Sequence, residues 1–288
     1  MKENLETENF SLWFPGHMRK SRYIISDNLK NIDIVYELLD ARAPTATKNK
    51  AIEDMIKNKL RLIILGKVDL AEKDLTKMWV KKFKKEGIFS IPLNCKNYIQ
   101  TKEIINISRM LLKELKLKKN KKNFSVKKFR AMVVGVPNVG KSTLINSLAG
   151  RKKAKTGNFP GVTKSKQWIV LDENIDLLDT PGNLSYEDRI NEESCFILEL
   201  LGSLKVGVFD EENVAFKLLN FLYKNRKDIL EKVFGFENID FSENLLEQYA
   251  KLKNMLQKGA IVDTKRAAEI LIRKFREGEF GRVTLQMP

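Results

Sequence analysis

The eight residues from 135 to 142 are Gly-Val-Pro-Asn-Val-Gly-Lys-Ser, and they match the phosphate-loop pattern GxxxxGK[ST] at every fixed position. An apolar run that predicts a buried strand, Phe129 to Val134, precedes them, and a helix is predicted to follow over Lys141 to Ala149. A strand, a glycine-rich loop and a helix form the context in which backbone N–H groups and a helix N-terminus hold phosphates. A glycine-rich turn without a ligand is the alternative, which the Lys-Ser pair in this context disfavours.

The side chains of this loop predict how it treats a nucleoside triphosphate. Lys141 is expected to place its ammonium group on the β- and γ-phosphates, and the Ser142 hydroxyl is expected to bind Mg²⁺. The other loop positions expected to contact the nucleotide are Pro137, Asn138, Val139, Gly140 and Thr143.

A second motif, Asp-Thr-Pro-Gly at 179–182, ends a strand predicted over Ile175 to Leu178. We expect Asp179 to reach Mg²⁺ through water and the N–H group of Gly182 to contact the γ-phosphate. Thr163 lies between the two motifs, and it is expected to bind Mg²⁺ when the γ-phosphate is present. An ordinary Pro-Gly turn with a solvated threonine is the alternative for this position.

The base is predicted from Gly-Lys-Val-Asp at 66–69, which follows a strand predicted over Arg61 to Leu65. The usual guanine-recognition motif is Asn-Lys-x-Asp, and Lys67 and Asp69 keep its last two chemical groups. A carboxylate here accepts hydrogen bonds from two guanine donors that adenine lacks, so adenine would leave the carboxylate unpaired. Gly66 departs from the motif, because it removes the side chain that normally tethers this loop to the phosphate loop, and we therefore expect weaker nucleotide binding.

Another loop is expected to complete the base site. Asn94, Cys95 and Lys96 follow a third predicted strand, in the place of the loop whose backbone N–H group contacts the guanine O6 atom.

The order of the motifs predicts the fold. Three strands are predicted before the phosphate loop, at 32–39, 61–65 and 88–93. The base motif therefore precedes the loop that it follows in ordinary GTPases, which predicts a circularly permuted P-loop GTPase domain over residues 1–204. This is an α/β fold with a mostly parallel sheet and helices on both faces. Strand signals then stop, and apolar residues at helical spacing predict an all-helical domain over 205–288.

Composition restricts the class of protein. The chain has 288 residues, of which 43% are hydrophobic and 31% charged, as is typical of a globular protein. No apolar run approaches the ~18–20 residues that cross a bilayer, and the N-terminus lacks a signal peptide, so we expect a cytoplasmic protein with no membrane contact. Two cysteines and one histidine exclude a disulfide framework, a Cys-rich zinc site and a metal centre built on two histidines.

The charge distribution favours a nucleic-acid partner. Lys and Arg number 53 against 37 Asp and Glu, which gives a net charge of +16. Residues 113–130 hold nine basic side chains and one acidic one, and residues 151–166 hold six basic side chains and none that is acidic. Such clusters release counterions from a phosphate backbone. A surface that is simply rich in lysine is the alternative, and the uneven distribution argues against it.

The chain resembles the YlqF/RbgA family of bacterial GTPases. The resemblance is carried by the permuted motif order, by Trp-Phe-Pro-Gly-His-Met at 13–18, by Asp-Ala-Arg at 40–42 and by the phosphate loop, and it covers residues 11–288. It implies a Mg²⁺-dependent GTPase that binds GTP and GDP, acts in late assembly of the large ribosomal subunit, binds ribosomal RNA and couples nucleotide state to release. It further implies hydrolysis that is slow alone and stimulated by the subunit, no DNA ligand and a monomer in solution.

The segment from Asp263 to Leu285 resembles the helical RNA-binding part of that family. The basic residues expected on its outer face are Arg266, Arg273, Lys274 and Arg276. An amphipathic core helix fits the same residues, with an apolar face made by Ala267, Ile270, Leu271 and Phe275, and the two descriptions are compatible.

The resemblance leaves open which residue orients the attacking water. His17 is one candidate, and packing beside Trp13 is its alternative role. Asn183 stands where ordinary GTPases carry a glutamine and this family an apolar residue, so it either orients water or continues the turn. With Lys141, these are the predicted catalytic residues. Asn138 resembles the asparagine that binds K⁺ in cation-stimulated GTPases, where the ion replaces the charge of an arginine finger.

Two other functions fit part of the pattern. One is an RNA-binding module that nucleotide switches and whose own hydrolysis is slow. The other is a P-loop enzyme acting on a small molecule, such as a kinase, against which the base motif and the Asp-Thr-Pro-Gly motif count.

Overall fold

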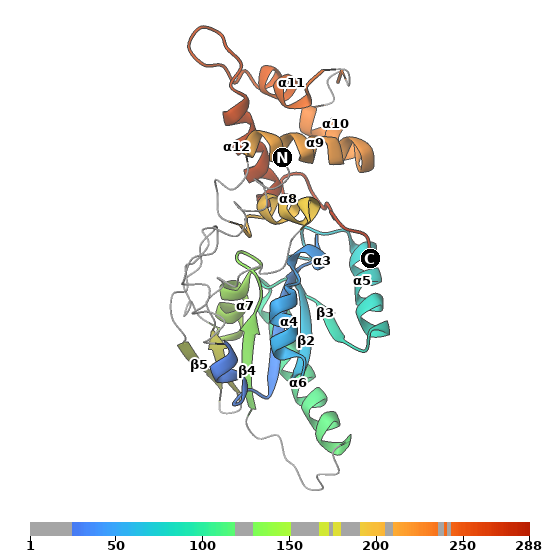
Figure 1. Ribbon diagram of the computed structural model, residues 1–288, viewed down its shortest axis with the longest axis vertical. Helices are drawn as coiled ribbons and strands as arrows, with labels where there is room; N and C mark the ends of the chain where they lie inside the picture. The colour runs from blue at the N-terminus through green and yellow to red at the C-terminus, as the bar shows by residue number, and fades with distance from the viewer. Residues whose placement is uncertain are drawn as a thin grey trace, which may run out of the picture.

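A six-stranded sheet forms the centre of the molecule (Figure 1). The structure is a computed structural model that describes residues 25–118, 129–150, 167–172, 175–179, 191–204, 210–235, 239–240 and 243–288. The strands are β1 (Ile34–Asp40), β2 (Leu60–Gly66), β3 (Phe89–Pro92), β4 (Phe129–Val134), β5 (Gln167–Asp172) and β6 (Ile175–Asp179). Their order is β3-β2-β1-β4-β6-β5, and every neighbouring pair is parallel except β5 with β6. The predicted mostly parallel sheet is confirmed.

Successive side chains of β1 pack against helices on opposite faces of the sheet, because successive residues of a strand point to opposite sides. Tyr36 and Leu38 belong to the core beneath α6 (Tyr98–Lys118) and α7 (Lys141–Leu148). Val35 and Leu39 face the other way, toward α4 (Lys50–Ile56) and α5 (Lys73–Lys85). The prediction of helices on both faces of the sheet is confirmed.

Helices follow the sheet along the chain, and Figure 1 shows them gathered beyond one end of it. They are α8 (Glu192–Leu200), α9 (Glu211–Asn225), α10 (Lys227–Phe234), α11 (Leu245–Leu252) and α12 (Thr264–Glu277). Side-chain caps start several of them, such as Asp263, which accepts from the N–H group of Arg266 at 3.0 Å. The buried faces of α9 and α12 pack together through Leu218, Leu222 and Leu271. Among the described residues, no helix is long and apolar enough to cross a membrane.

The last residues, 279–288, which we call the C-terminal tail, return to the sheet. Gly278 ends α12 in the left-handed conformation with a φ of 85°. The indole N–H group of Trp79 in α5 then donates to the carbonyl of Gln286 at 3.2 Å, and the side-chain oxygen of Gln286 accepts from the backbone of Ala46 at 2.9 Å. The chain therefore ends beside α5, as Figure 1 shows.

The prediction that Arg276 lies on the outer face of its helix is wrong. Its guanidinium donates to the carbonyls of Leu200 at 2.9 Å and Glu199 at 2.6 Å, at the C-terminal end of α8. Carbonyls in the last turn of a helix lack the usual partner four residues on and carry partial negative charge, so they attract a cation. The Glu199 carbonyl also accepts from the N–H group of Gly202 at 2.8 Å. By contrast, Arg266 and Arg273 are exposed, as expected.

We predict that Tyr36→Phe lowers the free energy of unfolding by about 1 kcal/mol, the net contribution of one hydrogen bond. The Tyr36 hydroxyl and the Ser108 hydroxyl lie 2.8 Å apart and join β1 to α6 in the buried core. Urea unfolding followed by circular dichroism measures the change. Tyr98→Phe is the matched control, because Tyr98 is 44% exposed. Equal effects of the two substitutions contradict the prediction.

Candidate nucleotide site

The predicted phosphate and base motifs meet at one edge of the sheet. The phosphate loop follows β4, and the turn at 66–70, which we call the base-recognition turn, follows β2. Asp40 ends β1, which lies between these two strands, and Ala41 and Arg42 follow it. Because all three strands are parallel, their carboxyl ends share this edge, where parallel α/β sheets bind ligands.

The phosphate loop lies directly against β1. Gly135 has a φ of 152°, and a Cβ atom there would stand 2.5 Å from the carbonyl oxygen of Leu38, so only glycine fits. The Lys141 ammonium is buried and donates to the carbonyls of Gly135 at 3.0 Å and Val136 at 2.7 Å, which keeps the cation within the loop. Ser142 and Thr143 follow in the first turn of α7, half-buried, where the helix N-terminus favours anions.

The segment after α8 supports the middle of this loop, which the sequence did not predict. The side-chain amide of Asn138 donates to the Gly202 carbonyl at 2.6 Å, and the Ser203 hydroxyl donates to the Pro137 carbonyl at 2.8 Å. Asn138 adopts the left-handed conformation with a φ of 58°, which asparagine tolerates better than most residues. Val139 and Gly140 complete the loop, with Val139 fully buried.

The base-recognition turn brings Lys67 and Asp69 to the same edge. Lys67 has a φ of 56°, and its carbonyl accepts from the N–H group of Leu70 at 2.9 Å, which closes the turn. Asp69 lies in the turn and is half-buried. Burial raises the pKa of Cys95 to about 12, and the charges of Lys67 and Asp69 both act on it. Strands β2 and β3 are paired, and the N–H group of Leu93 donates to the Leu65 carbonyl at 2.9 Å, so the two loops that carry the predicted base contacts leave the sheet side by side.

The backbone near Cys95 is held locally. The side-chain oxygen of Asn94 accepts from the N–H group of Lys96 at 3.0 Å, an Asx turn that fixes the loop after β3. Lys96 is exposed, whereas Cys95 is buried.

Asp40 is a site residue to which the sequence gave no role. Its carboxylate is buried and receives the Arg42 guanidinium in two hydrogen bonds, of 3.0 and 2.9 Å. The Lys67 ammonium lies 3.1 Å from the same carboxylate, so Asp40 joins β1 to the base-recognition turn. Burial favours the neutral acid, but the charges of Arg42 and Lys67 outweigh it and hold the pKa of Asp40 well below its usual range.

Four of the predicted site residues lie outside the described part of the chain: His17, Thr163, Gly182 and Asn183. Asp179 ends β6 and is paired with Val133 of β4, next to the phosphate loop, but its side chain also lies outside the described part. A serine hydroxyl and an aspartate carboxylate are oxygen ligands of the kind that Mg²⁺ prefers, so the chemistry of Ser142 and Asp179 fits that ion.

The geometry defines a P-loop nucleotide-binding domain in which the base-recognition turn precedes the phosphate loop along the chain. A family model described as "50S ribosome-binding GTPase" matches residues 130–234. Ribosome biogenesis GTPase A of Bacillus licheniformis is 39% identical over 279 residues, which cover 96% of this chain and 98% of that protein. The protein of the same name from Thermotoga maritima is 34% identical and covers 96% of this chain and 94% of its own length.

Solved structures agree with these relatives. YlqF of T. maritima in a GDP-bound form matches with a TM-score of 0.63 and 32% identity, over 92% of this chain and 98% of that one. A GNP-bound form of the same protein matches with a TM-score of 0.64 and 31% identity, over 93% and 98%. The chain belongs to the ribosome biogenesis GTPase A family, also called YlqF/RbgA.

We predict that Lys141→Ala abolishes GTP hydrolysis and weakens GTP binding about ten- to a hundredfold. The substitution removes the buried cation of the phosphate loop, and a hydrogen bond to a charged group contributes about 1.5–3 kcal/mol. Isothermal titration and a phosphate-release assay measure the two effects. Lys81→Ala, at an exposed lysine of α5, is the control. Near-normal turnover by Lys141→Ala contradicts the assignment of the loop.

We predict that Asp69→Asn moves the preference of the site from GTP toward XTP. Xanthine carries a carbonyl where guanine carries its amino group, so an amide side chain can donate where the carboxylate accepted. Competition titrations with GTP, XTP and ATP measure the change, with Asp74→Asn as a control at an exposed carboxylate. An unaltered GTP preference in Asp69→Asn places base recognition elsewhere.

Proposed function

We propose that this protein hydrolyses GTP as a late assembly factor of the large ribosomal subunit, binds ribosomal RNA and leaves the subunit when its nucleotide changes. The observation that carries the proposal is the meeting of Lys141 with Lys67 and Asp69 at one sheet edge, in the motif order of the family. The names of the relatives, which are ribosome biogenesis GTPases, support the choice of reaction and of particle. Assembly of ribosomes takes place in the cytoplasm, and we expect a monomer there.

In this proposal each group of residues in the site has its own role. Lys141 and the α7 N-terminus hold the β- and γ-phosphates, and Asp69 reads guanine. Ser142, Thr163 and Asp179 would hold Mg²⁺, which supplies positive charge to the phosphates when it is bound. Asn138 would offer an amide oxygen to K⁺, and His17 or Asn183 would orient the water.

The RNA contact is proposed for three segments of the chain. Residues 113–130 and 151–166 carry most of the excess positive charge, and they flank the phosphate loop in the sequence. Arg266 and Arg273 add exposed cations on α12. Arg276 is not among them, because its guanidinium is engaged by α8.

We predict that the protein sediments with immature large subunits in the presence of a non-hydrolysable GTP analogue and is released with GDP. Pelleting through a sucrose cushion measures the bound fraction, and turnover assays with and without subunits measure stimulation. Lys141→Ala is the control for nucleotide dependence. Equal binding in both nucleotide states contradicts the coupling to release, and no binding in either state contradicts the assembly role.

A further inference from the structure

The C-terminal tail holds the end of the base-recognition turn through hydrogen bonds of Val283 and Thr284. The N–H group of Val283 donates to the carbonyl of Leu70 at 3.0 Å, and the N–H group of Glu72 donates to the Thr284 hydroxyl at 2.9 Å. Val283 is 1% exposed and Thr284 6% exposed, so both bonds are shielded from competing water. The far end of the turn is therefore fixed by the last residues of the chain.

The tail also reaches the ion pair that fixes the near end of the turn. The N–H group of Leu285 donates to the carbonyl of Arg42 at 2.7 Å. Arg42 in turn holds the Asp40 carboxylate, which pairs with the Lys67 ammonium at 3.1 Å. The Arg42 guanidinium lies over the ring of Phe275 in α12, with its Cζ atom 5.2 Å from the centre of the ring. The turn is thus held at Lys67 by the Asp40 side chain and at Leu70 by the backbone of the C-terminal tail.

Position 66 explains why such support is needed in this chain. A Cβ atom at Gly66 would lie 3.4 Å from the carbonyl oxygen of Val139 in the phosphate loop. A side chain here would face that loop, but glycine has no group to bridge the two. The turn and the phosphate loop must therefore keep their relation by other contacts.

We propose that the C-terminal tail, together with the Asp40–Arg42 pair, positions the base-recognition turn and replaces the tether that an asparagine at residue 66 would supply. The tail residues do not touch the nucleotide, and they act on the purine base through Lys67 and Asp69. They are positioning residues that set guanine affinity and specificity. The inference rests on the proposed function, because it concerns how the same site selects its base.

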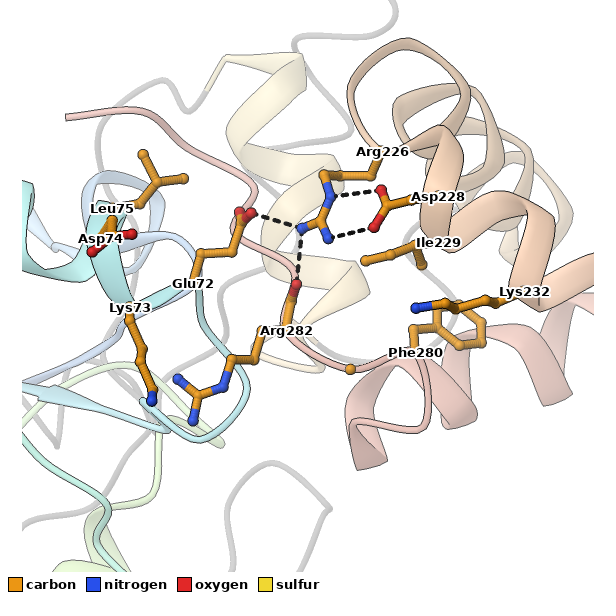
Figure 2. A pocket seen from close by; sticks show the side chains of 11 residues that line it. Glu72, Lys73, Asp74, Leu75, Arg226, Asp228, Ile229, Lys232, Phe280 and Arg282 are labelled. Atoms are coloured by element: carbon orange, nitrogen blue, oxygen red, sulfur yellow. Dashed lines mark hydrogen bonds and ion pairs between the residues drawn. The ribbon is translucent and has the colours of Figure 1, made fainter.

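The helices α9 to α12, which form the predicted helical domain, are tied to the tail and to Glu72 by further contacts. Figure 2 shows Arg226, between α9 and α10, in a cavity of about 430 Å³ where the two parts of the chain meet. Its guanidinium binds the Glu72 carboxylate at 2.7 Å, the Arg282 carbonyl at 3.0 Å and the Asp228 carboxylate at 3.0 Å. A displacement of the helical domain would therefore pull on both the tail and the residues after the turn.

The test compares GDP and ADP affinity by equilibrium titration for the full chain, a chain truncated after Arg282, and Thr284→Val. Truncation removes six hydrogen bonds: four that Val283, Thr284 and Leu285 make with Leu70, Glu72 and Arg42, and two that Gln286 makes with Trp79 and Ala46. Each net hydrogen bond is worth a factor of about two to ten in an equilibrium constant. Allowing for partial compensation, we expect about tenfold weaker GDP binding after truncation and about threefold weaker binding for Thr284→Val. ADP binding should not change, because the phosphate loop is intact in both variants.

Controls separate positioning from loss of folding. Thr264→Val removes a hydroxyl from α12 that bonds Glu212, far from the turn, and it should leave GDP and ADP affinity unchanged. Circular dichroism and the unfolding midpoint report on the fold of each variant. If the truncated chain does not fold, Thr284→Val against Thr264→Val decides the question.

Rescue provides the sharpest readout. Gly66→Asn should restore most of the GDP affinity of the truncated chain and of Thr284→Val, and it should improve the full chain less. The asparagine needs only a small movement of the Leu38 side chain, whose end would lie 3.2 Å from the new Cβ atom. An unchanged ratio of GDP to ADP affinity in the tail variants overturns the inference alone. A full chain without preference for GDP over ADP overturns the guanine assignment and this inference together.

Discussion

The buried ion pair between Asp40 and Arg42 is the contact on which the arrangement of the whole site depends. Both side chains are almost completely buried, and charges in such a place are tolerated only when each is paired and hydrogen-bonded. The guanidinium satisfies both carboxylate oxygens, and the backbone N–H group of Arg42 adds a third bond at 3.0 Å. Removing one partner of such a pair typically costs about 3–5 kcal/mol, because the other charge is left unpaired.

The position of this pair in the sheet explains why it affects both the phosphate loop and the base-recognition turn. It ends β1, which lies between the strand that leads to the phosphate loop and the strand that leads to the base-recognition turn. Leu38 in the same strand lies close to both loops. A Cβ atom added at Gly135 would stand 2.5 Å from its carbonyl oxygen, and one added at Gly66 would stand 3.2 Å from the end of its side chain. Among the described strands β1 comes first along the chain, and Arg42, which follows it, lies against the Phe275 ring of α12 and accepts a hydrogen bond from Leu285 of the C-terminal tail.

Sequence patterns predicted the parts of this structure that depend on local order. The bounds of β4 follow from its apolar run, and the phosphate loop follows from residue types at fixed spacing. The bond from the Ser203 hydroxyl to the Pro137 carbonyl and the bond from the Leu285 N–H group to the Arg42 carbonyl left no such signal, since both acceptors are backbone carbonyls, which every residue offers.

Arg276 shows the same limit for side chains. Helical periodicity placed it on the outer face of its helix, but the tertiary structure brings the carbonyl end of α8 to its guanidinium. Asp40 was visible as part of Asp-Ala-Arg, yet its pairing with Lys67 needs the parallel register that sets Asp40 beside Gly66. The roles given to His17, Thr163, Gly182 and Asn183 remain predictions.

Two routes link the nucleotide site to the helical domain, and they reach different parts of the nucleotide. The first runs from the phosphate loop through Gly202 to α8, whose C-terminal carbonyls bind Arg276 of α12. The second runs from the base-recognition turn through the tail to Arg226. Coupling between binding sites is reciprocal, so a partner that shifts the helical domain must change nucleotide affinity by the factor by which nucleotide changes the affinity for that partner. Because one route acts on the phosphates and the other on the base, the phosphate route alone can distinguish GTP from GDP, and the base route changes the affinity for both.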